Sequence, residues 1–390
     1  MLHRDERIAD VMRGARSMRS MLFERADELE EVRRLPADIA RQMAEIGVFR
    51  LVTPESVGGL EASPRQIFET VEELAKGTAS AGWCAMIAST TALNAAYMPL
   101  DQAKEIYSAP ETITGGVFAP MGKAVVEGDG YRVSGRWQWG SGSANCNWLC
   151  GGCMIFEDGE MRRTESGAPE NRMMIFPADE AELVDTWHVA GLKGTGSGDI
   201  EVKEIFVPKS RSVSLMSDEP REQGPLYLFP AFGLLALGVA SVAIGNAAGA
   251  LDSFKELAVK KANQGSSKTL SERAVIQSEY SKAVAAWKSA RAYLLDEIDT
   301  IWANVSEGNE LTFEARVDLR LACTNATRTC AEVCRTLYDY GGGAALFLNN
   351  DLQRRLRDAH AMTQHIVTAP ASYELLGRSL FGHPVNAAMI

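Results

Sequence analysis

The sequence lacks any signature of a metal centre or a disulfide framework. It contains seven cysteines, an odd number, at spacings that do not suggest pairing. Cys323, Cys330 and Cys334 recur on one face of a helix, which indicates small buried apolar residues. Cys150 and Cys153 form a Cys-x-x-Cys inside an apolar strand, without the second pair that a zinc site needs. We therefore expect no metal, and a reducing, cytoplasmic environment.

A nucleotide-binding loop is also missing, although residues 191–198 contain four glycines. A dinucleotide-binding loop lies between a strand and a helix, so that the phosphate meets the helix N-terminus. Here residues 200–207 follow, which alternate like a strand. The Gly-Lys-Ser/Thr of a P-loop is absent as well. The chain should therefore not bind NAD(P)H itself, and its reducing equivalents must come from elsewhere.

The sequence also lacks an excess of positive charge. The net charge of −11 argues against nucleic acid or an anionic membrane surface as a partner. Residues 229–251 carry no charge and are long enough to span a bilayer. They also contain four glycines and a proline, so we interpret them as a buried helix that neighbouring backbones approach closely. The first thirty residues are densely charged, so no signal peptide is expected.

The apolar residues follow a helical period in the first part of the chain, alternate as in strands in the middle part, and follow a helical period again in the last part. Residues 1–112 show helical periodicity, with prolines at early helix positions such as Pro36 and Pro64. Residues 113–223 alternate with period two and predict a small β-domain. Residues 224–390 return to long, alanine-rich helices. This order predicts an α+β fold with a helical domain on each side of the β-domain.

Several short segments resemble one family when taken in order. They are Ser80-Ala81-Gly82-Trp83, Ala119-Pro120-Met121-Gly122, a predicted strand at 137–143, residues 187–197, and a predicted late helix at 357–365. Together they resemble the acyl-CoA dehydrogenase fold in its oxygen-activating branch, the two-component (group D) flavin monooxygenases. That branch includes the seco-steroid phenol hydroxylases, the p-hydroxyphenylacetate hydroxylases and dibenzothiophene monooxygenase. The resemblance implies an N-terminal helical domain, a small central β-barrel or sandwich, and a C-terminal four-helix bundle.

The resemblance places a histidine where dehydrogenases of this fold place a catalytic glutamate. In those enzymes a Glu beside a Tyr follows the Arg-Asp pair, whereas here the stretch reads Gln364-His365-Ile366. It therefore implies His365 as the catalytic base, with an ordinary pKa near 6.5 that suits proton transfer at neutral pH. His365 could deprotonate a phenol or an N–H, or hold the distal oxygen of a flavin hydroperoxide. His360 lies roughly 140° around the same predicted helix and should face elsewhere. A purely structural histidine is the alternative.

The flavin site is also implied by the resemblance. Ser141 would lie near the flavin N5 as a second catalytic residue, and Trp83 would lie against the isoalloxazine ring. The alternatives are that Ser141 only completes a turn and that Trp83 is only core. The remaining residues implied to contact flavin, the last two through a neighbouring subunit, are Ala119, Pro120, Met121, Trp139, Gly142, Thr195, Ser197, Gly342 and Gly343.

Two further absences bear on cofactor and substrate. The FAD-binding members carry an Arg-x-x-Phe-Gly that grips the pyrophosphate, and residues 259–265 lack both the Arg and the Phe. Reduced FMN is therefore favoured over FAD, supplied by a separate NAD(P)H:flavin reductase. Some phenol hydroxylases hold the phenolate with a His that would fall within residues 89–92, where none is present. An indole, a polycyclic aromatic or a thiophene remains open as substrate.

These observations predict a reduced-flavin-dependent monooxygenase that uses O2 to hydroxylate an aromatic or heteroaromatic small molecule through a flavin C4a-hydroperoxide. One alternative is an acyl-CoA dehydrogenase-like oxidoreductase with a displaced base, for which Glu374 is the nearby candidate. Another is a catalytically silent flavin-binding or scaffold protein. Long helices such as residues 274–297 bury little in a monomer, and the resemblance implies a homotetramer.

Overall fold

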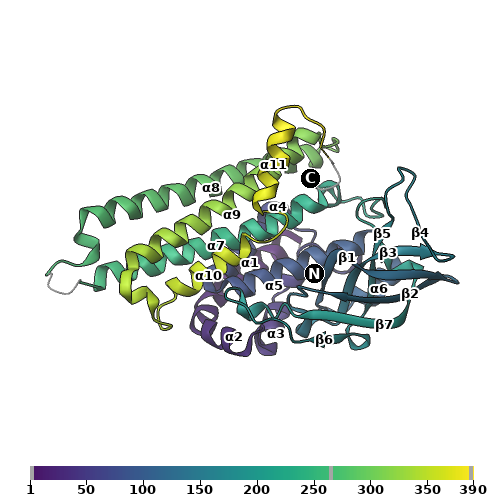
Figure 1. Cartoon of the computed structure of the whole chain (residues 1–390), viewed down its shortest axis with the longest axis horizontal. Coiled ribbons are helices and arrows are strands. Elements are labelled where there is room, and N and C mark those ends of the chain that lie inside the picture. Colours follow the sequence, from purple (N-terminus) through teal and green to yellow (C-terminus); the bar gives the residue numbers. More distant parts are fainter. Residues whose placement is uncertain (1–3, 263–266, 386–389) are drawn as a thin grey trace.

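Long helices and a twisted sheet occupy opposite ends of the molecule (Figure 1). The computed structural model describes residues 4–262, 267–385 and 390. Along the chain, helices come first, the strands of the sheet follow, and helices come again at the end, as the sequence pattern predicts. The predicted fold class is therefore confirmed.

The N-terminal part consists of six helices linked by short turns. Ser63 caps the fourth of them: its hydroxyl accepts a hydrogen bond from the Gln66 backbone N–H at 3.3 Å, and the Gln66 side chain accepts one from the Ser63 N–H at 2.9 Å. Pro64 is the first helical residue there, where no backbone N–H is needed. The helices are α1 (Arg4–Glu24), α2 (Ala26–Val32), α3 (Ala37–Glu45), α4 (Pro64–Gly77), α5 (Ala79–Thr91) and α6 (Leu100–Tyr107).

The central part is one mixed eight-stranded sheet. Its order is β6-β7-β2-β1-β3-β5-β8, with β4 paired to β3. β1 and β3 run parallel, and the other pairs are antiparallel. The strands are β1 (Thr114–Glu127), β2 (Gly130–Trp137), β3 (Trp148–Glu157), β4 (Glu160–Met161), β5 (Asn171–Pro177), β6 (Glu182–Val184), β7 (Asp199–Pro208) and β8 (Ser212–Val213).

A bulge interrupts β1 at the predicted Ala119-Pro120-Met121 segment. Val117 pairs with Gly151 and Gly122 with Cys153, so more residues lie between the pairs on β1 than on β3. A bulge of this kind bends the strand and turns backbone groups away from the ladder. Met121 is accordingly exposed. Bulges of this kind are frequent beside active sites.

The C-terminal part contains five helices: α8, α9 and α10 pack against the apolar helix α7, and α11 packs on α9. α7 is buried along most of its length, which confirms the buried-helix interpretation of residues 229–251. By length and composition it is the one described helix that could cross a membrane, but 94% of its most apolar window is buried in the protein. The helices are α7 (Ala231–Lys260), α8 (Ala274–Ser306), α9 (Phe313–Gly341), α10 (Leu352–Met362) and α11 (Pro370–Leu380).

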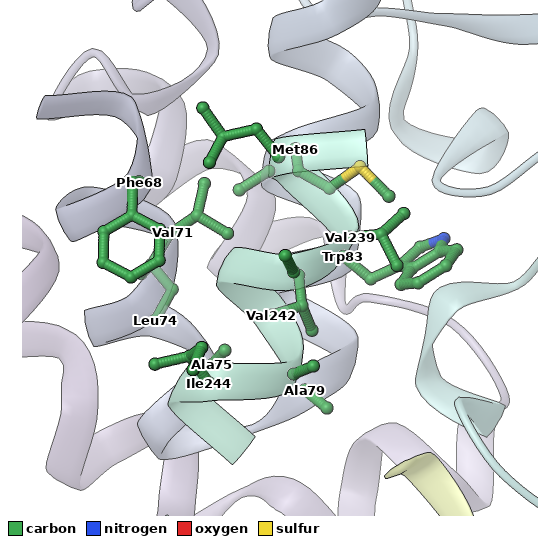
Figure 2. Close-up of a cluster of buried hydrophobic side chains, with 14 of the residues drawn as sticks. Phe68, Val71, Leu74, Ala75, Ala79, Trp83, Met86, Val239, Val242 and Ile244 are labelled. Carbon is green, nitrogen blue, oxygen red and sulfur yellow. The ribbon is translucent and has the colours of Figure 1, made fainter. Parts of the chain in front are cut away.

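Helices α4, α5 and α7 share one apolar core, and Trp83 lies at its edge (Figure 2). A glycine of α7 permits this packing, because a Cβ at Gly245 would lie 2.4 Å from the Glu72 carbonyl oxygen of α4. Phe68 and Val71 come from α4, and Val242 comes from α7. Trp83 therefore belongs to the core on one side and can face the sheet domain on the other.

Candidate active site

Three segments far apart in the sequence meet beside Trp83 of α5. The turn after β2 brings Ser141, the glycine-rich loop before β7 brings Thr195 and Ser197, and the turn after α10 brings His365. These are five of the residues predicted from the resemblance. The structure therefore assembles Trp83, Ser141, Thr195, Ser197 and His365 at one place, while their roles remain predictions.

The segment after β2 is a turn and not a strand. The strand ends at Trp137, so the prediction of a strand over 137–143 is wrong beyond its first residue. Trp139 adopts φ +67° and Gly142 φ +72°, left-handed conformations that break an extended ladder. The Gly142 N–H donates to the Thr195 carbonyl at 2.8 Å, which ties the turn to the glycine-rich loop. This tie holds Ser141 over the loop.

Hydroxyl groups form a buried row between the turn and the loop. The Trp83 Nε1–H donates to Ser141 Oγ at 3.0 Å. Ser141 Oγ lies 2.6 Å from Ser197 Oγ, which lies 2.6 Å from Thr195 Oγ1. Thr195 Oγ1 donates to the Leu192 carbonyl at 2.8 Å. Because all four of these side chains are buried, each hydroxyl depends on its neighbours for hydrogen bonds.

His365 contacts the edge of this row through Trp83. The two ring centroids are 5.6 Å apart with an interplanar angle of 68°, an edge-to-face contact. Helix α10 ends at Met362, so the prediction that His365 is helical is wrong; it lies in the turn that follows. His365 is half-buried, whereas His360 is exposed on α10. The two histidines therefore have different surroundings, as predicted. The reason is that His365 lies in the turn after α10, and not that the two residues point to different sides of one helix.

The pKa of His365 is not ordinary. Burial, with a smaller contribution from the Arg320 charge, lowers it to about 4. The ring is therefore neutral at pH 7. The Val367 backbone N–H donates to Nδ1 at 3.4 Å, so the proton of the neutral ring belongs on Nε2. In this state the His365 ring can donate a hydrogen bond through Nε2 but is a weak base. The pKa near 6.5 that was expected from the sequence is therefore replaced by a lower one.

Two charged residues that support the site were not predicted. Arg320 of α9 is buried, and its Nη1 donates to the Val367 carbonyl at 3.1 Å in the turn that carries His365. Asp358 of α10 is buried, and its Oδ1 accepts from the Leu192 N–H at 2.6 Å. Burial raises the pKa of Asp358 to about 6. The Arg357-Asp358 pair was visible in the sequence as part of the family pattern, but Arg320 carries no local signal.

Two of the predicted residues, both glycines, lie away from this cluster. Gly342 and Gly343 follow α9 at its end distant from the sheet, where Lys261 Nζ donates to the Gly341 carbonyl at 2.8 Å (Figure 1). Their contact with flavin was predicted through a neighbouring subunit and stays a prediction. Glu374, the alternative base, is exposed on α11. Pro120, Met121 and Trp139 are exposed and Ala119 is partly buried. Trp139 belongs to the turn of Ser141, whose N–H donates to the Trp139 carbonyl at 2.9 Å.

Two family models match most of the helical parts. The acyl-CoA dehydrogenase N-terminal domain matches residues 8–105, and the acyl-CoA dehydrogenase C-terminal domain matches residues 237–370. The chain is 33% identical to indole-3-acetate monooxygenase of Acinetobacter baumannii over 360 residues, which cover 92% of this chain and 90% of the relative. It is 30% identical to the oxygenase subunit HsaA, a flavin-dependent monooxygenase of Mycobacterium tuberculosis, with 94% of each chain covered.

Solved structures agree with these relatives. The M. tuberculosis HsaA structure superposes with a TM-score of 0.90 at 27% identity, covering 98% of this chain and all of the other. XiaF from Streptomyces sp., solved with FADH2 and glycerol, superposes with a TM-score of 0.89 at 25% identity, covering 98% and 97%. These matches define an enzyme of the acyl-CoA dehydrogenase fold. The chain belongs to the acyl-CoA dehydrogenase family and, within it, to the flavin-dependent monooxygenases that serve as oxygenase components of two-component systems.

The residues present fit a flavin. Ser141 Oγ accepts a hydrogen bond from the Trp83 indole, and the Trp83 ring is in edge-to-face contact with the His365 imidazole. A hydroxyl and aromatic rings are groups that can hydrogen-bond and flank a flat heteroaromatic ring. Gly142 leaves room next to it, since a Cβ there would have its nearest neighbour, Cys84 Sγ, at 3.6 Å. Among the residues that the structure describes, no cluster of three or more His, Cys, Asp or Glu could hold a metal.

Proposed function

We propose that this monooxygenase hydroxylates a small aromatic or heteroaromatic molecule with O2 and a reduced flavin delivered by a separate NAD(P)H:flavin reductase. The observation that carries the proposal is the grouping of His365, Trp83 and Ser141, with a histidine where the dehydrogenases of this fold carry a glutamate. With Nδ1 accepting from the Val367 N–H and the proton on Nε2, the His365 ring has no free lone pair with which to remove the α-proton of an acyl thioester. The exposed Glu374 gives the dehydrogenase alternative no support.

Each residue of the cluster has a task in this proposal. Reduced flavin, when bound, would supply the two electrons for monooxygenation, in which one oxygen atom of O2 enters the product and the other leaves as water. Ser141 holds the flavin ring through a hydrogen bond, and Trp83 flanks it. His365 donates its Nε2–H to the oxygen that is transferred, which favours the second of its two predicted roles over proton removal. A preorganised donor in a site with little water is worth several kcal/mol.

The substrate we propose is an uncharged heteroaromatic ring such as an indole. The relative from A. baumannii is named for indole-3-acetate. Residues 89–92 offer no histidine to stabilise a phenolate, and Ser89 donates to the Val48 carbonyl at 3.2 Å. An indole needs no histidine of this kind, because its ring is neutral when it reacts and carries no phenolate charge to be stabilised.

We predict no turnover with NADH alone, since the sequence contains neither the dinucleotide-binding pattern nor a P-loop. Purified protein, an indole, O2 and NADH should give no hydroxylated product. Addition of a flavin reductase with catalytic flavin, or of photoreduced flavin, should start product formation. Product from NADH on protein free of reductase would contradict the proposed source of electrons.

Reduced FMN and reduced FAD should be titrated side by side in the same experiment. We propose tighter binding of FMN, because the pyrophosphate clamp of the FAD-binding members is missing from residues 259–265. Of that stretch, residues 263–265 lie outside the described residues. FADH2 in XiaF makes FAD the alternative, and equal or tighter binding of FAD would reject FMN as the preferred cofactor.

We propose a homotetrameric, cytoplasmic enzyme. Leu346, Phe347 and Leu348 follow α9 as three consecutive apolar residues, all exposed in the single chain. Exposed apolar runs of this kind mark surfaces that another protein covers. We predict a tetramer by multi-angle light scattering and weaker assembly on replacement of Phe347 by Asp. A fully active monomer would contradict the predicted contribution of Gly342 and Gly343 to a neighbour's site.

A further inference from the structure

The hydroxyl row beside Trp83 can be ordered in only one direction. It contains four donor hydrogens, on Trp83 Nε1, Ser141 Oγ, Ser197 Oγ and Thr195 Oγ1, and four contacts of hydrogen-bond length. Each contact needs one hydrogen. Indole N–H donates only, and a backbone carbonyl accepts only. The two ends of the row therefore fix the direction of everything between them.

The Leu192 carbonyl fixes the far end. It lies 2.8 Å from Thr195 Oγ1, so the Thr195 hydroxyl donates to it. Thr195 then accepts from Ser197, and Ser197 accepts from Ser141. In the reverse order Thr195 Oγ1 and the Leu192 carbonyl oxygen would face each other at 2.8 Å with no proton between them. Two buried oxygens in that position repel, so the reverse order is disfavoured.

The Leu192 carbonyl is itself held in place. Leu192 is buried in the left-handed conformation, with φ +53°. Its N–H donates to Asp358 Oδ1 at 2.6 Å, and its carbonyl also accepts from Trp187 Nε1 at 3.0 Å. The acceptor that orders the row cannot turn away without losing these contacts.

The consequence falls on Ser141. Its single hydrogen is used toward Ser197, and it accepts one hydrogen bond from Trp83. One lone pair remains, and no hydrogen. Toward a further group Ser141 can only accept a hydrogen bond.

We propose that Ser197 and Thr195 are positioning residues that keep Ser141 a pure acceptor, so that the site selects the flavin by its redox state. N5 of reduced flavin carries a hydrogen and donates, whereas N5 of oxidised flavin has only a lone pair. An acceptor-only Ser141 pairs with the first and repels the second. The inference rests on the proposed placement of Ser141 at N5, and it gives that residue a specificity that a freely rotating hydroxyl would not have.

The test is the ratio of two dissociation constants, for oxidised and for anaerobically reduced flavin, measured by fluorescence and absorbance titration. Ser197→Ala removes the acceptor of the Ser141 hydrogen, and Thr195→Val removes the group that fixes the direction of the Ser141–Ser197 contact. In either variant Ser141 can donate its hydrogen to a further group. Each should lower the ratio of the oxidised to the reduced constant by about tenfold, chiefly by tightening the binding of oxidised flavin. Thr195→Ser keeps the hydroxyl and should keep the ratio of the parent.

Trp83→Phe is the discriminating variant. It removes a donor to Ser141 but leaves the direction from Ser141 to Leu192 unchanged. Both dissociation constants should change while their ratio is retained. An unchanged ratio in Thr195→Val or Ser197→Ala, or the same loss of ratio in Thr195→Ser, would overturn the inference. Failure of the proposed function would appear instead in the parent protein, as no binding of reduced flavin and no hydroxylation.

Discussion

Replacement of His365 by alanine should lower hydroxylated product per reduced flavin by on the order of 10²-fold, with the electrons recovered as hydrogen peroxide. The imidazole lies edge-on to Trp83 at 5.6 Å, and Val367 N–H orients it through Nδ1. In the proposed mechanism, loss of the ring removes a fixed donor from the reacting oxygen, while Ser141 and Trp83, the residues proposed to hold the flavin, remain. Product and peroxide should be measured together in a single turnover, with flavin binding measured separately.

His360→Ala is the matched control. His360 is exposed on α10, five residues before His365, and should leave product and peroxide near the values of the parent. If His360→Ala uncouples the reaction and His365→Ala does not, the wrong histidine was chosen. If both remain coupled, a histidine in this region has no part in oxygen transfer.

The pH dependence distinguishes a donor from a base. With its pKa lowered to about 4, His365 is neutral across pH 6–8, so coupling should not fall through a titration near pH 6.5. The same shift acts on stability. The unfolded chain binds the histidine proton near pH 6.5 but the folded chain only near pH 4, so the free energy of unfolding falls as pH drops from 6.5 to 4.

Asp358 acts in the opposite sense within the same range. Its raised pKa, about 6, favours the folded state at low pH, and that contribution is lost as pH rises through 6. The difference between the parent and His365→Ala isolates the histidine. That difference should grow, in favour of the variant, as pH falls below 6.5 in urea denaturation.

The sequence was informative where a local pattern decides the outcome. The glycine-rich segment 191–198 is followed by residues that alternate like a strand, whereas a nucleotide-binding loop is followed by a helix. In the structure strand β7 does follow this segment. An uncharged segment rich in glycine is better suited to a packed core than to an isolated membrane span, and α7 is that core. Both conclusions depend on neighbours in sequence, which is why they could be drawn without coordinates.

The sequence was uninformative where distant segments meet. Ser141 and Ser197 are 56 residues apart, and nothing local says that their oxygens lie 2.6 Å from each other. The pKa of His365 depends on burial and on Arg320 from another helix. The helix predicted over 357–365 ends early, at Met362, because Thr363 and Gln364 begin a turn that the pattern of side chains did not reveal. These features arise from tertiary packing, which only the folded chain shows.

Gly191→Ala should cost about 3 kcal/mol of stability and weaken the binding of reduced flavin. A Cβ at Gly191 would lie 2.1 Å from the Arg357 carbonyl oxygen and 2.9 Å from the Asp358 N, so the loop rests on the backbone of α10 itself. Arg357 also holds this loop, through the Ala190 carbonyl, and pairs with Glu30 of α2 at 2.8 Å. None of these atoms is the flexible end of a side chain, so the loop must move away.

That movement would reach the flavin site through Leu192. Its N–H would leave Asp358, which would then be a buried carboxylate without its closest donor. Leu192 would carry its carbonyl away from Thr195, and the hydroxyl row to Ser141 would lose its anchor. Urea denaturation measures the first effect, and titration with photoreduced flavin measures the second.

Gly377→Ala is the matched control, because it makes the same chemical change in α11, where a Cβ would have no atom within 4 Å. Alanine there should be neutral or should stabilise the protein by about 0.5–1 kcal/mol, since glycine is a poor helix former. Equal stability of the parent and Gly191→Ala would mean that the loop can shift freely on α10. In that case Asp358 would not anchor Leu192, and the order of the hydroxyl row would need another explanation.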